Sequence, residues 1–186
     1  TTLFRSFYLS HIALKTHEYE LAAKTLDKIL NIDPTADLEQ ILAGIAPEQA
    51  QDREILLNAL RASKEKDNPS ILALIAGLEA QDGLYEQALS NINRALRKRS
   101  KSTSFILMKA NLLMALRDDT ATQKWFAKAS RKNRNNLDVR LAEARYYIQI
   151  NQQQEALDKL ENIIKDHPQA EEALFIAGLT SIDLKQ

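Results

Sequence analysis

The chain has 186 residues, and its 25 Lys and Arg residues balance its 25 Asp and Glu residues. This zero net charge gives no support to nucleic acid or a membrane surface as a general partner. The absence of cysteine excludes disulfides, thiol nucleophiles and cysteine-ligated metals. No apolar run approaches the roughly 18 residues that a membrane-spanning helix needs, and the low content of Gly and Pro favours long helices joined by short turns.

The sequence predicts five helical pairs and one further helix. The pairs occupy residues of about 3–36, 37–68, 69–102, 103–136 and 137–170, and the last helix lies within 171–186. The second pair is two residues shorter, and its first helix, "LEQILAGI", is brief. Pro47 with Glu48 can open its second helix, because proline and acidic residues favour a first helical turn. The chain starts at Thr1 without an initiator methionine, and we expect it to be a piece of a longer protein.

A fixed sequence period, about 34 residues long, relates the pairs. We call the first helix of each pair odd and the second helix even. Small residues in the middle of the odd helices are spaced by this period, and so are apolar residues of the even helices. The columns are Ala76, Ala110, Ala144 and Gly178; Ala88, Thr122 and Ala156; and Ile92, Phe126 and Leu160. Apolar residues three and four apart form a stripe on one helix face. Because one hairpin cannot cover its own stripe, the pattern predicts an all-α fold, an α-solenoid of stacked antiparallel hairpins in a single array.

These columns resemble the tetratricopeptide repeat (TPR), a scaffold for protein interactions. The second half of the repeat signature is carried by Ala22, Leu26 and Pro34 near the start, and again by Ala156, Leu160 and Pro168. The first half departs from the signature, since Ser6, Leu72, Ile106, Arg140 and Leu174 stand where tryptophan would. The resemblance covers nearly the whole chain and implies a superhelical array that binds a protein partner.

Nothing in the sequence indicates catalysis or a bound cofactor. His11 and His17 are six residues apart, which misses the spacing of paired helical metal ligands. There is no phosphate-binding loop and no nucleophile elbow. Asp118 and Asp119, the most tempting acid pair, stand where a helix should start, and we interpret them as capping residues. We therefore expect no enzyme, no metal and no cofactor.

Charge is unevenly distributed along the chain. Residues 94–145 carry 14 basic and 4 acidic residues, whereas the stretches on either side are acidic. Because the basic residues recur with the period, we predict a basic ridge at the ends of the even helices. It consists of Arg94, Arg97, Lys98, Lys128, Arg131 and Lys132. Cations in a last helical turn also stabilise the helix dipole, so the ridge has three interpretations: a solvated surface, a contact for an acidic protein, or a phosphate contact.

The resemblance implies that the odd helices line a concave, partner-binding face. The residues that we expect there, at least partly exposed, are Phe7, Tyr8, His11, Leu107, Met108, Asn111, Met114, Leu141, Arg145 and Ile148. The corresponding positions of the third pair include Ala73 and Leu74. Only Asn111 and Arg145 suit a carboxylate clamp, so the expected face is mainly apolar, with methionines that adapt to varied partners. The alternative is that a tight superhelix buries these side chains within the chain.

The functional prediction is a scaffold or adaptor that binds a protein segment through its concave face. The alternatives are a nucleic-acid-binding repeat that uses the basic ridge, and a structural oligomerisation array. Few aromatic residues accompany the ridge, which disfavours nucleic acid. We also expect self-association through the C-terminal end, where Leu174 and Leu179 lack a following helix. The phrases "IAPEQAQ" and "AGLTSIDLKQ" resemble long bacterial TPR proteins, among them envelope lipoproteins, and suggest a periplasmic or envelope location.

Overall fold

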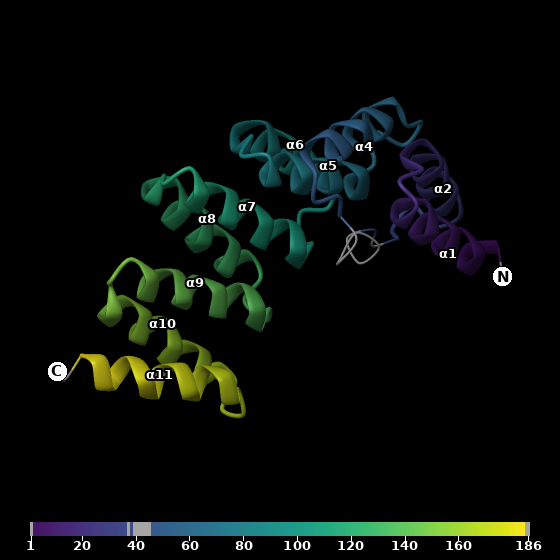
Figure 1. Cartoon of the computed structure of the whole chain (residues 1–186). Coiled ribbons are helices and arrows are strands. Elements are labelled where there is room, and N and C mark those ends of the chain that lie inside the picture. Colours follow the sequence, from purple (N-terminus) through teal and green to yellow (C-terminus); the bar gives the residue numbers. More distant parts are fainter. Residues whose placement is uncertain (1, 37, 39–45, 185–186) are drawn as a thin grey trace. The chain divides into compact units, whose positions relative to one another are not determined.

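The computed structural model describes residues 2–36, 38 and 46–184, and all regular structure in these residues is α-helical (Figure 1). The predicted all-α fold is confirmed. The helices are α1 (Thr2–Lys15), α2 (Tyr19–Ile32), α4 (Ala50–Ala62), α5 (Pro69–Gln81), α6 (Tyr85–Lys98), α7 (Thr103–Ala115), α8 (Asp119–Lys132), α9 (Leu137–Gln149), α10 (Gln153–Asp166) and α11 (Glu171–Asp183).

The chain forms two compact units, Thr1–Ser100 and Lys101–Gln186, hereafter unit 1 and unit 2. In unit 1, α1 packs on α2, α2 on α4, α4 on α5, and α5 on α6. In unit 2, α7 packs on α8 and α9, α8 on α9, α9 on α10, and α10 on α11. The boundary lies in the loop between α6 and α7, two residues before the predicted end of the third pair. Within each unit, neighbouring hairpins therefore stack as the repeat period requires.

Polar side chains cap the starts of α5, α7, α8 and α9. Asn68, Ser102 and Asn136 follow one another at the repeat period and cap α5, α7 and α9, accepting hydrogen bonds from backbone N–H groups two or three residues later. Asp118 caps α8, with 2.9 Å between its Oδ1 and the Ala121 nitrogen. The interpretation of Asp118 as a capping residue is therefore confirmed.

The turns inside the hairpins repeat one backbone geometry. His17, Gly83, Arg117 and Asn151 have φ values of 61°, 75°, 55° and 58°, in the left-handed region. In each turn, the N–H of the next residue donates to a carbonyl five residues back, as from Leu84 to Glu79 at 2.9 Å and from Gln152 to Tyr147 at 2.8 Å. This is the Schellman arrangement, which satisfies the last carbonyls of a helix. Helices α1, α5, α7 and α9 are therefore each followed by a residue with left-handed backbone geometry.

This geometry predicts opposite effects for two glycine substitutions. Gly83→Ala should lower the free energy of unfolding by about 1 kcal/mol, because a Cβ is strained at positive φ. Gly178→Ala, within α11, should raise it by about 0.5–1 kcal/mol, because alanine favours the helix and its Cβ would meet no atom within 4 Å. Urea unfolding followed by circular dichroism measures both. If both variants changed the free energy of unfolding in the same direction, the different backbone roles of Gly83 and Gly178 would be contradicted.

The repeat columns form the cores of both units. Ala76, Ala110 and Ala144 are buried in the odd helices, and the apolar residues Leu26, Ile92, Phe126 and Leu160 are buried in the even helices. In unit 2, Phe126 packs against Tyr146, with 5.6 Å between the ring centroids. Burial, together with a hydrogen bond to Asp119, raises the pKa of Tyr146 to about 12. Gly178 continues the small-residue column but is exposed, since no described element packs there.

The shortened second pair differs from its prediction. The segment "LEQILAGI" lies outside the described residues except for Leu38, which is buried. Pro47 and Glu48 do not open the following helix, which begins at Ala50 after the cap residue Gln49. Instead, the carbonyl oxygen of Pro47 accepts a hydrogen bond from the Arg53 guanidinium at 3.1 Å. Because this carbonyl bonds to a side chain of α4, the stretch before α4 is held in a non-helical turn.

Two buried carboxylates link helices within the units, and neither was predicted. In unit 1, Glu79 of α5 accepts from Arg61 of α4 at 2.9 Å and from Asn91 of α6 at 2.8 Å. In unit 2, Glu143 of α9 accepts from Lys159 of α10 at 2.7 Å. Both carboxylate side chains are 3% exposed. These pairs fix how the neighbouring helices face each other, because a buried carboxylate is costly without its partner.

Candidate protein-binding surfaces

In unit 1, the predicted residues of α1 differ in exposure. Phe7 is half-buried and packs against the core of the unit, His11 is half-buried, and Tyr8 is 63% exposed. Tyr8 belongs to an apolar stripe that also contains Phe4, Leu9 and Ile12, all exposed. These three residues were not predicted, although their helical spacing is visible in the sequence. The exposed surface of α1 is centred on Tyr8 rather than on Phe7.

The corresponding positions of α5 form no open surface. Ala73 is fully buried and Leu74 is 3% exposed, and Leu74 packs into the core of unit 1. The expectation that these positions line a binding face is wrong for this helix. The reason lies in its sequence, "PSILALIAGLEAQ", which is apolar on all sides, and such helices are buried all round.

In unit 2, α7 presents a mixed surface. Leu107, Met108 and Met114 are half-buried, and Asn111 is exposed between them in helical spacing. Met114 also packs against the cluster of Ala110, Phe126 and Tyr146. Met114 is therefore anchored on the unit, while Leu107 and Met108 are partly open to solvent.

Helix α9, which packs on α7, carries the other predicted residues of unit 2, and one of them needs correction. Arg145 is exposed and forms an ion pair with Glu172 of α11, and Ile148 is half-buried. Leu141 is only 1% exposed and belongs to a core cluster with Leu160 and Ala173. The expectation that Leu141 is exposed is wrong, because α10 and α11 enclose it. The residues of this surface that remain open are Leu107, Met108, Asn111, Met114, Arg145 and Ile148, hereafter the α7–α9 face.

Two of the basic ridge residues on α6 form polar contacts within unit 1. Arg94 pairs with Asp67, and the Lys98 ammonium donates to the Asp67 backbone oxygen at 2.8 Å. Both contacts hold the turn that precedes α5. Arg97 is exposed. Two of the three ridge residues on α6 therefore have a structural role, while Arg97 faces solvent.

The basic residues of α8 are less engaged. Lys128, Arg131 and Lys132 are all exposed in unit 2. Lys128 lies near Lys109 of α7, whose ammonium sits 4.2 Å from the centroid of the Trp125 ring. Burial, and to a lesser extent the charge of Lys128, lowers the pKa of Lys109. The α8 side of unit 2 thus carries more positive charge than its own carboxylates neutralise.

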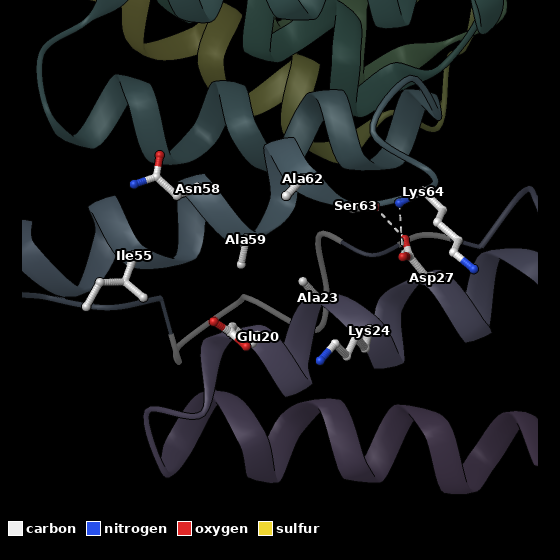
Figure 2. Close-up of a pocket in the computed structure, with 10 residues that line it drawn as sticks. All are labelled: Glu20, Ala23, Lys24, Asp27, Ile55, Asn58, Ala59, Ala62, Ser63 and Lys64. Atoms are coloured by element: carbon white, nitrogen blue, oxygen red, sulfur yellow. Dashed lines mark hydrogen bonds between the residues drawn. The ribbon is translucent and has the colours of Figure 1, made fainter.

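A groove within unit 1 lies between α2 and α4 and has a volume of about 520 Å³. Figure 2 shows Ala23 on one wall and Ala59 and Ala62 on the other, with Glu20 and Lys24 at the rim. At one end, Asp27 accepts hydrogen bonds from the Ser63 hydroxyl and from the Lys64 backbone nitrogen at 3.2 Å. Asp27 therefore fastens the end of α4 to α2. Small side chains leave the groove open, a feature that the period did not predict.

The described residues show neither a metal-binding cluster nor a membrane-spanning helix. They contain no group of three His, Asp or Glu side chains placed to hold a metal ion. His17 contacts Asp52, with 3.1 Å between Nδ1 and Oδ2. None of the described helices is both long and apolar enough to cross a membrane.

Stacked helix hairpins, left-handed hairpin turns at a fixed period and buried small residues together define a helical-repeat protein. No family model matches the sequence, and no curated protein matches it. Similarity is instead found among solved structures, which share the arrangement of helices but little sequence identity with this chain.

The chain is similar to a TPR protein from Parabacteroides merdae, with 16% identity and a TM-score of 0.57 over 99% of this chain and 74% of that one. A thermophilic TPR protein from Thermus thermophilus has 14% identity and a TM-score of 0.60 over 97% of this chain and 99% of that one. YrrB has 16% identity and a TM-score of 0.53 over 88% and 86% of the two chains. The resemblance to the tetratricopeptide repeat is thereby confirmed at the level of the fold.

Proposed function

We propose that this chain is a protein-interaction scaffold that binds a segment of a partner protein on the α7–α9 face. The observation that carries the proposal is that the face combines partly exposed apolar side chains with exposed polar ones. Apolar Leu107, Met108 and Ile148 are half-buried, and polar Asn111 and Arg145, on the same two helices, are exposed. Binding sites commonly combine an apolar surface with a few polar groups that fix orientation.

Two further points support this function. Methionine is flexible and polarisable, so Met108 and Met114 can adapt to a partner's side chains. YrrB, which has the same fold, is described as a TPR protein with an unusual peptide-binding site. A scaffold also needs no catalytic group. The test is whether substitutions on the α7–α9 face weaken binding of a partner isolated with the intact protein, while substitutions of Gln154 and Glu161, exposed on α10, do not.

A second candidate function is self-association through α11. Its exposed stripe contains Phe175, which is 67% exposed, and Ile182, which is 56% exposed, with Leu174 and Leu179 beside them. Burying such a stripe between two copies is worth about 25 cal/mol per Å² of apolar area. We expect the average mass of the chain in sedimentation equilibrium to rise with concentration.

The double variant Phe175→Ser with Ile182→Ser should remove this association without disturbing the fold, because both side chains are exposed. A matched variant on α1, Phe4→Ser with Tyr8→Ser, also removes two exposed large side chains. A wild-type chain that stays monomeric at high concentration would exclude self-association. Loss of association in the α1 variant alone would place the interface elsewhere.

A further inference from the structure

Unit 2 contains a polar pocket that the proposed function does not use. It lies between the end of α8, the first half of α9 and the second half of α10, and its volume is about 320 Å³. Its lining consists of Ser130, Arg131, Arg134, Arg140, Glu143, Lys159, Asn162, Ile163 and Asp166. Four of these side chains are cationic and two are anionic.

Both carboxylates of the pocket are already neutralised. Glu143 pairs with Lys159 at 2.7 Å, and Asp166 pairs with Arg140 at 2.9 Å. The side chain of Arg140 is 10% exposed and also donates to the Arg134 carbonyl oxygen at 3.2 Å. These bonds hold the Arg140 guanidinium in a fixed orientation on the wall of the pocket.

Hydrogen-bond donors remain in excess. Arg131 has no ion pair within the described residues, and the Arg134 guanidinium lies 3.8 Å from Asp166, a carboxylate that Arg140 already occupies. The hydroxyl oxygen of Ser130 is buried and has no hydrogen-bond partner within the described part of the chain. The Arg131 and Arg134 guanidinium groups and the Ser130 hydroxyl therefore line a cavity whose two carboxylates already form ion pairs with other residues.

We propose that this pocket binds a carboxylate side chain from an acidic segment of the partner protein. The planar guanidinium group donates two parallel hydrogen bonds, which match the two oxygens of a carboxylate. The cavity is near the lower limit of about 300 Å³ for ligand sites, so it fits a side chain of a bound segment. The proposal rests on the protein-binding function and adds the chemical class of the partner.

The composition of the lining favours protein over nucleic acid. Sites for single-stranded nucleic acid combine cations with aromatic side chains on which the bases stack. The lining of this pocket has no aromatic residue. A carboxylate needs only the donors that the pocket supplies.

The experiment measures fluorescence anisotropy of a labelled hexaglutamate peptide titrated with the whole chain. Arg131→Gln with Arg134→Gln should weaken binding at least tenfold, because it removes the two least engaged guanidinium groups. The matched control is Lys128→Gln with Lys132→Gln, which removes the same charge from exposed positions on α8 that lie outside the pocket lining. It should weaken binding less than twofold. Circular dichroism confirms that each variant is folded.

Three results would overturn the proposal. The peptide does not bind at millimolar concentration, the two double variants weaken it equally, or a uridine oligonucleotide binds more tightly than the peptide and depends on the same arginines. Partner binding that survives Leu107→Ala with Ile148→Ala would reject the α7–α9 face, whereas peptide binding that survives Arg131→Gln with Arg134→Gln would reject the pocket. A failure of the α7–α9 face to bind a partner is therefore distinguishable from a failure of the pocket.

Discussion

Replacing Leu141 by alanine should lower the free energy of unfolding by about 2–5 kcal/mol. The side chain is 1% exposed and packs against Leu160, Ile163 and Ala173, so its removal leaves a cavity between α9, α10 and α11. The cost contains the lost transfer free energy of the side chain and the lost contacts around the cavity. Urea unfolding of the variant and the wild type measures the difference.

The matched control is Leu107→Ala. Leu107 lies one repeat period before Leu141, in the same column of the repeat, but is half-buried. We expect a loss of about 1 kcal/mol there, because part of the side chain is already in contact with water. Equal losses at the two positions would contradict the assignment of Leu141 to the core and of Leu107 to the surface.

Simultaneous replacement of Leu107 and Ile148 by alanine should weaken partner binding more than tenfold, a change of about 1.4 kcal/mol or more in binding free energy. Both side chains belong to the α7–α9 face and are half-buried. Interface energy concentrates in a few anchored apolar residues, and these two lie on adjacent odd helices of unit 2. Titration calorimetry with the isolated partner measures the change.

A double variant on α10, Gln154→Ala with Glu161→Ala, serves as the control, since both residues are exposed and lie on another helix. It should bind the partner as the wild type does. Both double variants should keep the helical circular dichroism of the wild type. A loss of helical signal in Leu107→Ala with Ile148→Ala would show that these residues support the fold instead of a binding face.

The repeat period predicted the fold because stacking imposes the same demand on every hairpin. Ala76, Ala110 and Ala144 must be small where helices approach, and Ile92, Phe126 and Leu160 must be apolar where they are covered. Capping was also predictable for Asp118, since the residue type and its position before a helix are both local signals. The start of α4 was mispredicted: the helix begins at Ala50, and the Pro47 carbonyl oxygen accepts a hydrogen bond from Arg53, a contact that residue types before a helix do not reveal.

The candidate sites were less predictable, because exposure depends on which neighbours cover a residue. Leu107 and Leu141 occupy equivalent positions, yet only Leu141 is enclosed by two further helices. The spacing of the basic residues on α6 predicted a solvent-facing basic ridge. Arg94 and Lys98 instead contact Asp67, in a turn whose position the repeat spacing does not reveal. The buried pair of Glu143 with Lys159 joins two helices, and no spacing along one helix reveals such a pair.

The most direct test of the central claim is site-specific photo-cross-linking to the partner recovered with the intact protein. A photoreactive benzoylphenylalanine replaces Met108, on the α7–α9 face, or Glu161, exposed on α10. The account predicts a covalent adduct with the partner from position 108 and little or none from position 161. An adduct of equal yield from both positions, or one from position 161 alone, would contradict the assignment of partner binding to the α7–α9 face.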